Sequence, residues 1–90
     1  MTGYCVSDIA AITGGVLSGD GAAPVTGVVI DSRAITPGAL FAAIPGERVD
    51  GHDYIAKAFD LGAACCLAQR VPAGENRPVI CVPDTAAAVS

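Results

Sequence analysis

Positive charge is scarce in this chain of 90 residues, which has five lysines and arginines against nine aspartates and glutamates and a formal net charge of −4. The cationic residues are also scattered along the chain: Arg33, Arg48, Lys57, Arg70 and Arg77. Because nucleic-acid-binding surfaces need clustered positive charge, we expect no nucleic-acid partner. A phosphate-bearing ligand would have to be held by one or two local arginines and by backbone amides, since the overall field repels anions.

Long hydrophobic runs are absent as well. Apolar runs such as Ala63 to Ala68 are far shorter than the roughly 18 residues of a membrane-spanning helix, so we expect no membrane partner. The first residues, MTGYCVSDIAAI, contain no basic leader followed by an apolar stretch and a cleavage site. We therefore expect a cytoplasmic protein.

The sequence also lacks the spacing of a metal site. His52 is the single histidine, and the cysteines at positions 5, 65, 66 and 81 form no CxxC pair. Cys65 and Cys66 are neighbours in a strand-like segment, so their side chains should point to opposite faces of a sheet. We expect no bound metal and interpret the cysteines as buried, reduced thiols, which is typical of a reducing compartment.

A loop that could cradle the phosphates of ATP is missing too. The pattern GxxxxGK[ST] does not occur, because the only lysine, Lys57, follows Ala56. No cluster of carboxylates is arranged to hold magnesium. We therefore expect this chain by itself to hold no cofactor and to contain no catalytic residue.

Alternating helix and strand patterns predict an α/β fold with a small mixed β-sheet flanked by helices. Apolar runs bounded by glycine, proline and polar residues predict strands at 16–18, 25–30, 39–44, 65–68 and 79–82. A helix is expected from Ser7, its cap, to Ile12, with Ile9 and Ile12 facing the core. A second is expected over 53–61, and Asp84 would cap a third.

Glycines mark the predicted ends and turns. Gly14 and Gly62 are placed to end the first two helices, and Pro37-Gly38 predicts a tight turn before the third strand. Asp20-Gly21 is a turn dipeptide that would join the first two strands, with the glycine at positive φ.

The segment Ile30-Asp31-Ser32-Arg33 follows a predicted strand at its carboxyl end, which is where ligands bind in open α/β sheets. Ser32 and Arg33 can both donate hydrogen bonds to a ligand there, and Asp31 is expected to orient the loop. The alternative is that Asp31 and Ser32 only stabilise the turn by bonding nearby amides, with Arg33 in solvent.

The loop Pro45 to Asp53 contains two glycines and several charged residues and leads directly into a helix, so it can approach a ligand closely. Arg48 is the candidate for binding a phosphate or carboxylate, because guanidinium geometry suits both. Asp50 could shape the pocket, or it could belong with Asp53 to the capping of the helix.

Four further residues near this loop have structural interpretations. A lone histidine at a helix start is expected to close a local hydrogen bond, and no partner base or nucleophile for His52 is evident. Tyr54 and Phe41 are expected to pack, with stacking on a base as the alternative for Tyr54. Lys57 is interpreted as a solvated helix residue.

The stretch VIDSRAITPGALFAAIPGERVDGHDYIAKAFDL, residues 29–61, closely resembles the substrate-binding N-terminal domain of the Mur ligases, and the resemblance covers nearly the whole chain. It implies that residues 1–83 form this domain and that 84–90 begin a helix leading toward a central ATPase domain. It also implies substrate contacts on two segments. The DSR signature places Ile30 and Ser32 on the UDP moiety, and the loop that folds over the nucleotide and muramoyl group places Glu47, Arg48 and Val49 there.

Within that family, IPGERVDGHDYI is most similar to the ligase that joins D-alanyl-D-alanine to UDP-N-acetylmuramoyl-tripeptide, a cytoplasmic step in making the cell-wall precursor. The resemblance implies that the full enzyme uses ATP and Mg²⁺ and forms an acyl phosphate that the incoming amine attacks. Its central ATPase and C-terminal domains would be partners of this domain. The present chain would bind the UDP-N-acetylmuramoyl-peptide without catalysis.

Three other interpretations stay open on the sequence. The chain could belong to the preceding ligase, which adds the third amino acid and shares the DSR and DGH-like features. It could be a free-standing, non-catalytic module that binds a UDP-sugar or a protein. It could also be a small structural domain whose glycine loops only connect strands.

Overall fold

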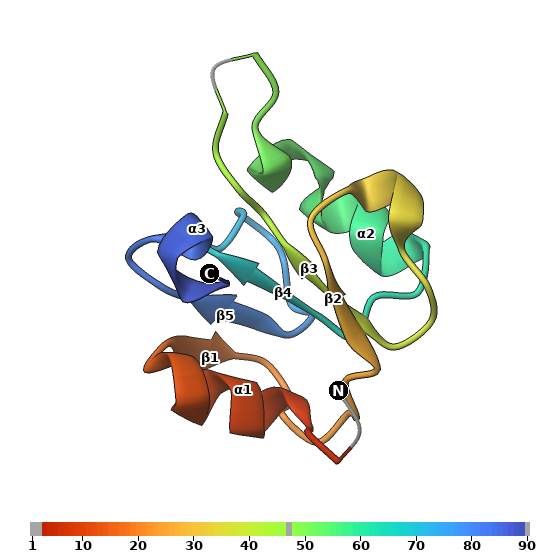
Figure 1. The fold of residues 1–90 in the computed structure, drawn as a ribbon, viewed down its shortest axis with the longest axis vertical. Helices are drawn as coiled ribbons and strands as arrows, with labels where there is room; N and C mark the ends of the chain where they lie inside the picture. The colour runs from red at the N-terminus through yellow and green to blue at the C-terminus, as the bar shows by residue number, and fades with distance from the viewer. Residues whose placement is uncertain (1–2, 47, 90) are drawn as a thin grey trace.

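The computed structural model describes residues 3–46 and 48–89, and these form one mixed β-sheet with helices on both faces (Figure 1). The strands are β1 (Val16–Ser18), β2 (Gly27–Val29), β3 (Ala39–Ala42), β4 (Cys65–Ala68) and β5 (Val79–Cys81). The α-helices are α1 (Val6–Thr13), α2 (Ile55–Asp60) and α3 (Thr85–Ala88). Two short 3-10 helices, η1 (Ser32–Ala34) and η2 (Gly51–Tyr54), follow β2 and precede α2. The expected α/β class with a small mixed sheet is confirmed.

The strand order is β1-β5-β4-β3-β2, with β2 to β5 parallel and β1 antiparallel to β5. The first two strands therefore lie at opposite edges of the sheet, and the expectation that Asp20-Gly21 joins them in a tight turn is wrong. Gly19 has the positive φ in this connection, at 101°, and Gly21 does not. Gly21 is needed for space instead, because a Cβ there would lie 2.8 Å from both Leu17 Cδ2 and Ser7 Cβ.

Two buried clusters cover the two faces of the sheet. Alternate residues of the central strands supply them, as the pleat of a strand requires: Leu40 and Cys65 pack with α1 on one face, and Phe41 and Cys66 pack with α2 on the other. Figure 1 shows α1 and α2 on these opposite sides. The prediction that Cys65 and Cys66 are buried thiols on opposite faces is confirmed, whereas Cys5 and Cys81 are only partly buried, which corrects the expectation that all four are buried.

The first helix differs from its prediction in its N-cap residue and in one of its two expected core residues. Cys5, not Ser7, is the N-cap, and the Asp8 carboxylate accepts the Cys5 N–H at 3.0 Å. Ile9 is buried, but Ile12 is 65% exposed. The reason is angular: the buried face is centred on Val6, Ile9 and Ala10, and Ile12 lies about a third of a turn away from that centre.

The other predicted ends hold. Gly14 ends α1 and Gly62 follows α2, with φ of 71° and 109°, and Gly38 has φ 85° in the turn before β3. The Asp84 carboxylate caps α3 by accepting the Ala87 N–H at 3.1 Å. The helix predicted over 53–61 is instead η2 followed by α2, because residues 51–54 wind more tightly around the Asp50 cap. Within the described residues, no helix is long and apolar enough to cross a membrane.

The buried thiols lead to a prediction about labelling. Burial raises the pKa of Cys65 to about 12 and raises that of Cys66 as well, so both are protonated and inaccessible at neutral pH. During iodoacetamide treatment at pH 8, peptide mass spectrometry should find label on the partly exposed Cys5 and Cys81 only. In urea all four should react. Native labelling of Cys65 or Cys66 at the rate of Cys5 would contradict the structure.

Candidate functional site

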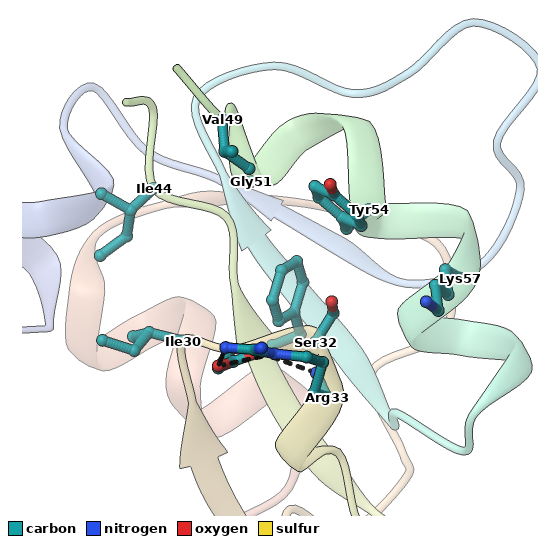
Figure 2. A pocket seen from close by; sticks show the side chains of 10 residues that line it. Ile30, Ser32, Arg33, Ile44, Val49, Gly51, Tyr54 and Lys57 are labelled. Atoms are coloured by element: carbon teal, nitrogen blue, oxygen red, sulfur yellow. Dashed lines mark hydrogen bonds and ion pairs between the residues drawn. The ribbon is translucent and has the colours of Figure 1, made fainter. Parts of the chain in front are cut away.

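A cleft of about 690 Å³ opens at the carboxyl ends of β2 and β3. Because β2 to β5 are parallel, their carboxyl ends meet at one edge of the sheet, where ligands bind in such folds. The cleft lies between the loop after β2 and the η2–α2 segment, as Figure 2 shows. Its lining residues are Ile30, Asp31, Ser32, Arg33, Phe41, Ile44, Val49, Gly51, Tyr54 and Lys57.

Asp31 and Arg33 hold the first wall of the cleft in shape. The Asp31 carboxylate accepts the backbone N–H of Arg33 at 2.9 Å, which caps η1, and pairs with the Arg33 guanidinium at 2.8 Å. The guanidinium and then this backbone N–H lower the pKa of Asp31 to about 2. The expected loop-orienting role of Asp31 is thus seen, and the Arg33 side chain, 85% exposed, is paired with it rather than fully solvated.

Ser32 differs from the turn-stabilising interpretation. The residue is only 9% exposed, and Figure 2 shows its hydroxyl directed into the cleft. Within the described residues its hydroxyl makes no hydrogen bond. The hydroxyl oxygen opens to the cleft and is not sealed in the core, so it is available to a ligand that enters.

The loop between β3 and η2 contributes the opposite rim. Val49 and Gly51 line the cleft, whereas Arg48 is exposed and Asp50 is half-buried, and neither belongs to the lining. Glu47, the remaining predicted contact on this loop, lies outside the described residues. The sequence-predicted residues Ile30, Ser32, Arg33 and Val49 are therefore brought together, and Arg48 and Asp50 stand apart from them.

Asp50 fills the capping role that was its alternative interpretation. Its Oδ1 accepts the His52 backbone N–H at 3.0 Å and contacts His52 Nδ1 at 2.7 Å, while Oδ2 pairs with Arg70 at 3.2 Å. The His52 N–H, the His52 ring and the Arg70 guanidinium lower the pKa of Asp50 to about 2. The carboxylate therefore holds the loop and the ring beside it.

His52 makes a longer-range contact than its position at a helix start suggested. Its side chain is 1% exposed, and its Nε2 accepts the backbone N–H of Gln69, just beyond β4, at 2.9 Å. Because Nε2 accepts a hydrogen bond, Nδ1 carries the hydrogen, and this N–H donates a hydrogen bond to Asp50 Oδ1. The neutral ring thereby ties the rim of the cleft to the end of β4.

Sequence reasoning kept a ligand contact of Tyr54 only as an alternative and missed the position of Lys57 beside the cleft. Tyr54 and Lys57 line it and are three residues apart, a spacing that places both on one side of a helix. Tyr54 closely follows the glycine-containing loop, so the helical spacing from Tyr54 to Lys57 was the signal that could have identified Lys57. Phe41 is 1% exposed and forms part of the base of the cleft. Among residues 3–46 and 48–89, no group of three or more His, Cys, Asp or Glu side chains could hold a metal ion.

Residues 24–89 match the family described as Mur ligase family, catalytic domain. The chain belongs to the Mur ligase family. It is 52% identical over 93 aligned residues to the UDP-N-acetylmuramoyl-tripeptide--D-alanyl-D-alanine ligase of Mycobacterium bovis, a match that covers 97% of this chain and 18% of the relative. The resemblance inferred from the DSR and DGH segments is thus confirmed.

This Mur ligase chain is also similar to a second type of ligase and to a solved structure. It is 49% identical over 63 residues to the UDP-N-acetylmuramoyl-L-alanyl-D-glutamate--2,6-diaminopimelate ligase of Streptomyces coelicolor, over 70% of this chain and 12% of that protein. The solved Acinetobacter baumannii UDP-N-acetylmuramoylalanyl-D-glutamyl-2,6-diaminopimelate--D-alanyl-D-alanyl ligase superposes with a TM-score of 0.80 at 26% identity, covering 96% of this chain and 20% of that one. The chain therefore spans a fifth or less of the length of these relatives.

The His52 contacts lead to a stability prediction. Replacing His52 by Ala removes a buried ring and both of its hydrogen bonds, which should lower the free energy of unfolding by about 2–4 kcal/mol. His52→Gln places an amide oxygen where it can accept the Gln69 N–H and should lose less. Urea unfolding measures both, with Asp53→Asn, at an exposed neighbour, as the control expected within about 0.5 kcal/mol of the unmodified chain. Equal losses for the Ala and Gln variants would refute the tether to Gln69.

Asp50 should contribute stability that depends on pH. Its pKa in the folded chain, about 2, lies below its ordinary value of 3.8, so the contribution is complete above that ordinary value and is lost as the pH falls toward 2. Urea midpoints measured from pH 6 to pH 2 should therefore fall less steeply for Asp50→Asn than for the unmodified chain. Asp53→Asn should retain the steep fall. An identical acid slope for the Asp50 and Asp53 variants would show that the Asp50 contacts do not persist in solution.

Proposed function

We propose that the cleft binds the UDP-bearing end of a UDP-N-acetylmuramoyl-peptide. The observation that carries the proposal is the Ser32 hydroxyl, which belongs to a residue only 9% exposed and faces the cleft without a hydrogen-bond partner among the described residues. Ile30 and Val49, which the family resemblance also assigns to the substrate, border the same space. The relatives' names, which include UDP-N-acetylmuramoyl-tripeptide, support this ligand class.

The remaining predicted contacts belong to the same proposal at the rim. Arg33 lines the cleft, and Glu47, Arg48 and Asp50 belong to the loop that would close over the nucleotide and the muramoyl group. Arg48 would reach a phosphate or carboxylate from outside the present lining. Asp50 would act indirectly, by holding the loop through His52.

In the complete enzyme we propose that residues 1–83 are the substrate-binding domain and that 84–90 begin the helix toward a central ATPase domain. That domain would use ATP and Mg²⁺ to phosphorylate the peptide carboxylate, and D-alanyl-D-alanine, held with a C-terminal domain, would attack the acyl phosphate in the cytoplasm. This chain would bind and not catalyse. Binding energy from the remote UDP end would help to position the reacting carboxylate.

The D-alanyl-D-alanine-adding type is our first choice because the mycobacterial relative matches over 97% of this chain. The second candidate is the type that adds the third amino acid, which the Streptomyces relative supports at 49% identity over 70% of the chain. A full-length enzyme assay separates them: the first predicts amide formation between UDP-N-acetylmuramoyl-tripeptide and D-alanyl-D-alanine, and the second predicts consumption of the dipeptide precursor and a diamino acid. A chain that binds without any ATP-dependent ligase encoded with it would favour a free-standing module.

The binding proposal predicts the outcome of an NMR titration of this chain with UDP-N-acetylmuramoyl-tripeptide. Saturable amide shifts should appear at residues 30–33 and 48–51, which are the two walls of the cleft. Ser32→Ala should weaken binding about tenfold through the loss of one hydrogen bond to a charged group. Ser18→Ala, an exposed serine on β1, is the matched control and should bind normally. The absence of saturable shifts at millimolar ligand would overturn the proposal.

A further inference from the structure

The cations of the chain are mostly engaged by carboxylates. Arg33 pairs with Asp31, Arg70 with Asp50, and Arg77 with both Glu75 and Asp60. Each of these guanidinium groups has its charge compensated locally. These arginines hold loops in place, and their paired charges contribute little electrostatic attraction for a ligand.

Lys57 differs from these arginines. Among the described residues no carboxylate lies within ion-pairing distance of its ammonium group, and the side chain is exposed where α2 borders the cleft. Figure 2 shows Lys57 on the α2 wall, across the cleft from Arg33. A lysine in this position has three N–H donors available to whatever enters.

Among the described residues that line the cleft, one positive charge is therefore left without an ion-pair partner. Asp31 and Arg33 cancel each other at 2.8 Å, and Lys57 remains. The chain as a whole carries a formal charge of −4, so the cleft is a local exception to a field that repels anions. The unpartnered Ser32 hydroxyl opens into the same space and can donate to an anionic oxygen.

We propose that Lys57, together with Ser32, forms the subsite for a phosphoryl group of a nucleoside diphosphate. This inference rests on the proposed function and assigns its anionic contact to α2 rather than to the rim arginine, Arg48. The ammonium group neutralises phosphate oxygens as a point charge, and the hydroxyl supplies a directed hydrogen bond. The aromatic side chain of Tyr54 in the same cleft offers apolar surface to the rest of the nucleotide.

The test compares Lys57→Gln, Lys57→Arg and a charge-matched control in calorimetric titrations of this chain with UDP and with uridine. The control is Ala11→Glu, which also lowers the net charge by one but lies at an exposed position of α1, on the opposite face of the sheet. Lys57→Gln should weaken UDP binding about tenfold and leave uridine binding unchanged, since uridine has no phosphate. Lys57→Arg should stay within about threefold, and Ala11→Glu within about twofold, of the unmodified chain. The loss caused by Lys57→Gln should shrink as salt is raised.

The outcomes separate this inference from the function on which it rests. If the chain binds UDP and Lys57→Gln changes nothing, or weakens UDP and uridine equally, the phosphoryl subsite is overturned and the binding function stands. If Ala11→Glu weakens UDP as much as Lys57→Gln, general charge rather than a subsite is responsible and the inference fails. If neither UDP nor UDP-N-acetylmuramoyl-tripeptide binds the unmodified chain, both proposals fail together. Unchanged urea midpoints for the variants exclude unfolding as the cause.

Discussion

The buried imidazole of His52 is the contact on which the shape of the cleft depends. Hydrogen bonds position the end of the loop from β3 to η2. His52 supplies one to the Gln69 N–H beyond β4, and Gly51 supplies another by donating to the Ile44 carbonyl at 3.0 Å. Gly51 must be glycine for that approach, because a Cβ would lie 2.7 Å from the Ile44 nitrogen. The rim residue Val49 lies in the loop that the hydrogen bond between Gly51 and Ile44 closes.

Gln69 extends this arrangement to the third helix. Its backbone N–H bonds to His52, and its side-chain Oε1 accepts the Thr85 N–H at 3.1 Å at the start of α3. The cleft rim and the start of α3 are thus joined through one residue at the carboxyl edge of the sheet.

The charge that a ligand meets at the cleft depends on which side chains form ion pairs, and not only on the net charge of the chain. Asp31 and Asp50 each bind a backbone N–H and an arginine, so the acidic residues beside the cleft are neutralised by the loops that they shape. Among the described residues that line the cleft, Lys57 is therefore the charged side chain that has no ion-pair partner. Composition alone predicts repulsion of anions and cannot show where such a charge lies.

Sequence reasoning was strongest where the signal was local. The strands β3 and β4 are continuous apolar runs between turn residues, and Gly38 and Gly62 have the positive φ expected of them. It failed where partners are distant along the chain. The pairing of β1 with β5 and the 65% exposure of Ile12 depend on which surfaces meet in the folded chain. For the candidate site, the DSR segment lies at the carboxyl end of a strand, as expected, and lines the cleft. Lys57 is exposed, as its interpretation as a solvated residue requires, but no local pattern shows that it also borders the cleft.

By itself the sequence determined the family and the α/β class and named candidate binding residues, because these follow from residue types at fixed local spacing. Only the tertiary structure decided which of them share a cleft. Parallel pairing of β2 and β3 carries Ser32 and α2 to one edge of the sheet, and the long-range bond from His52 to Gln69 sets the rim opposite. Such contacts join residues that are far apart in the chain, and packing of the whole fold is what brings them within bonding distance.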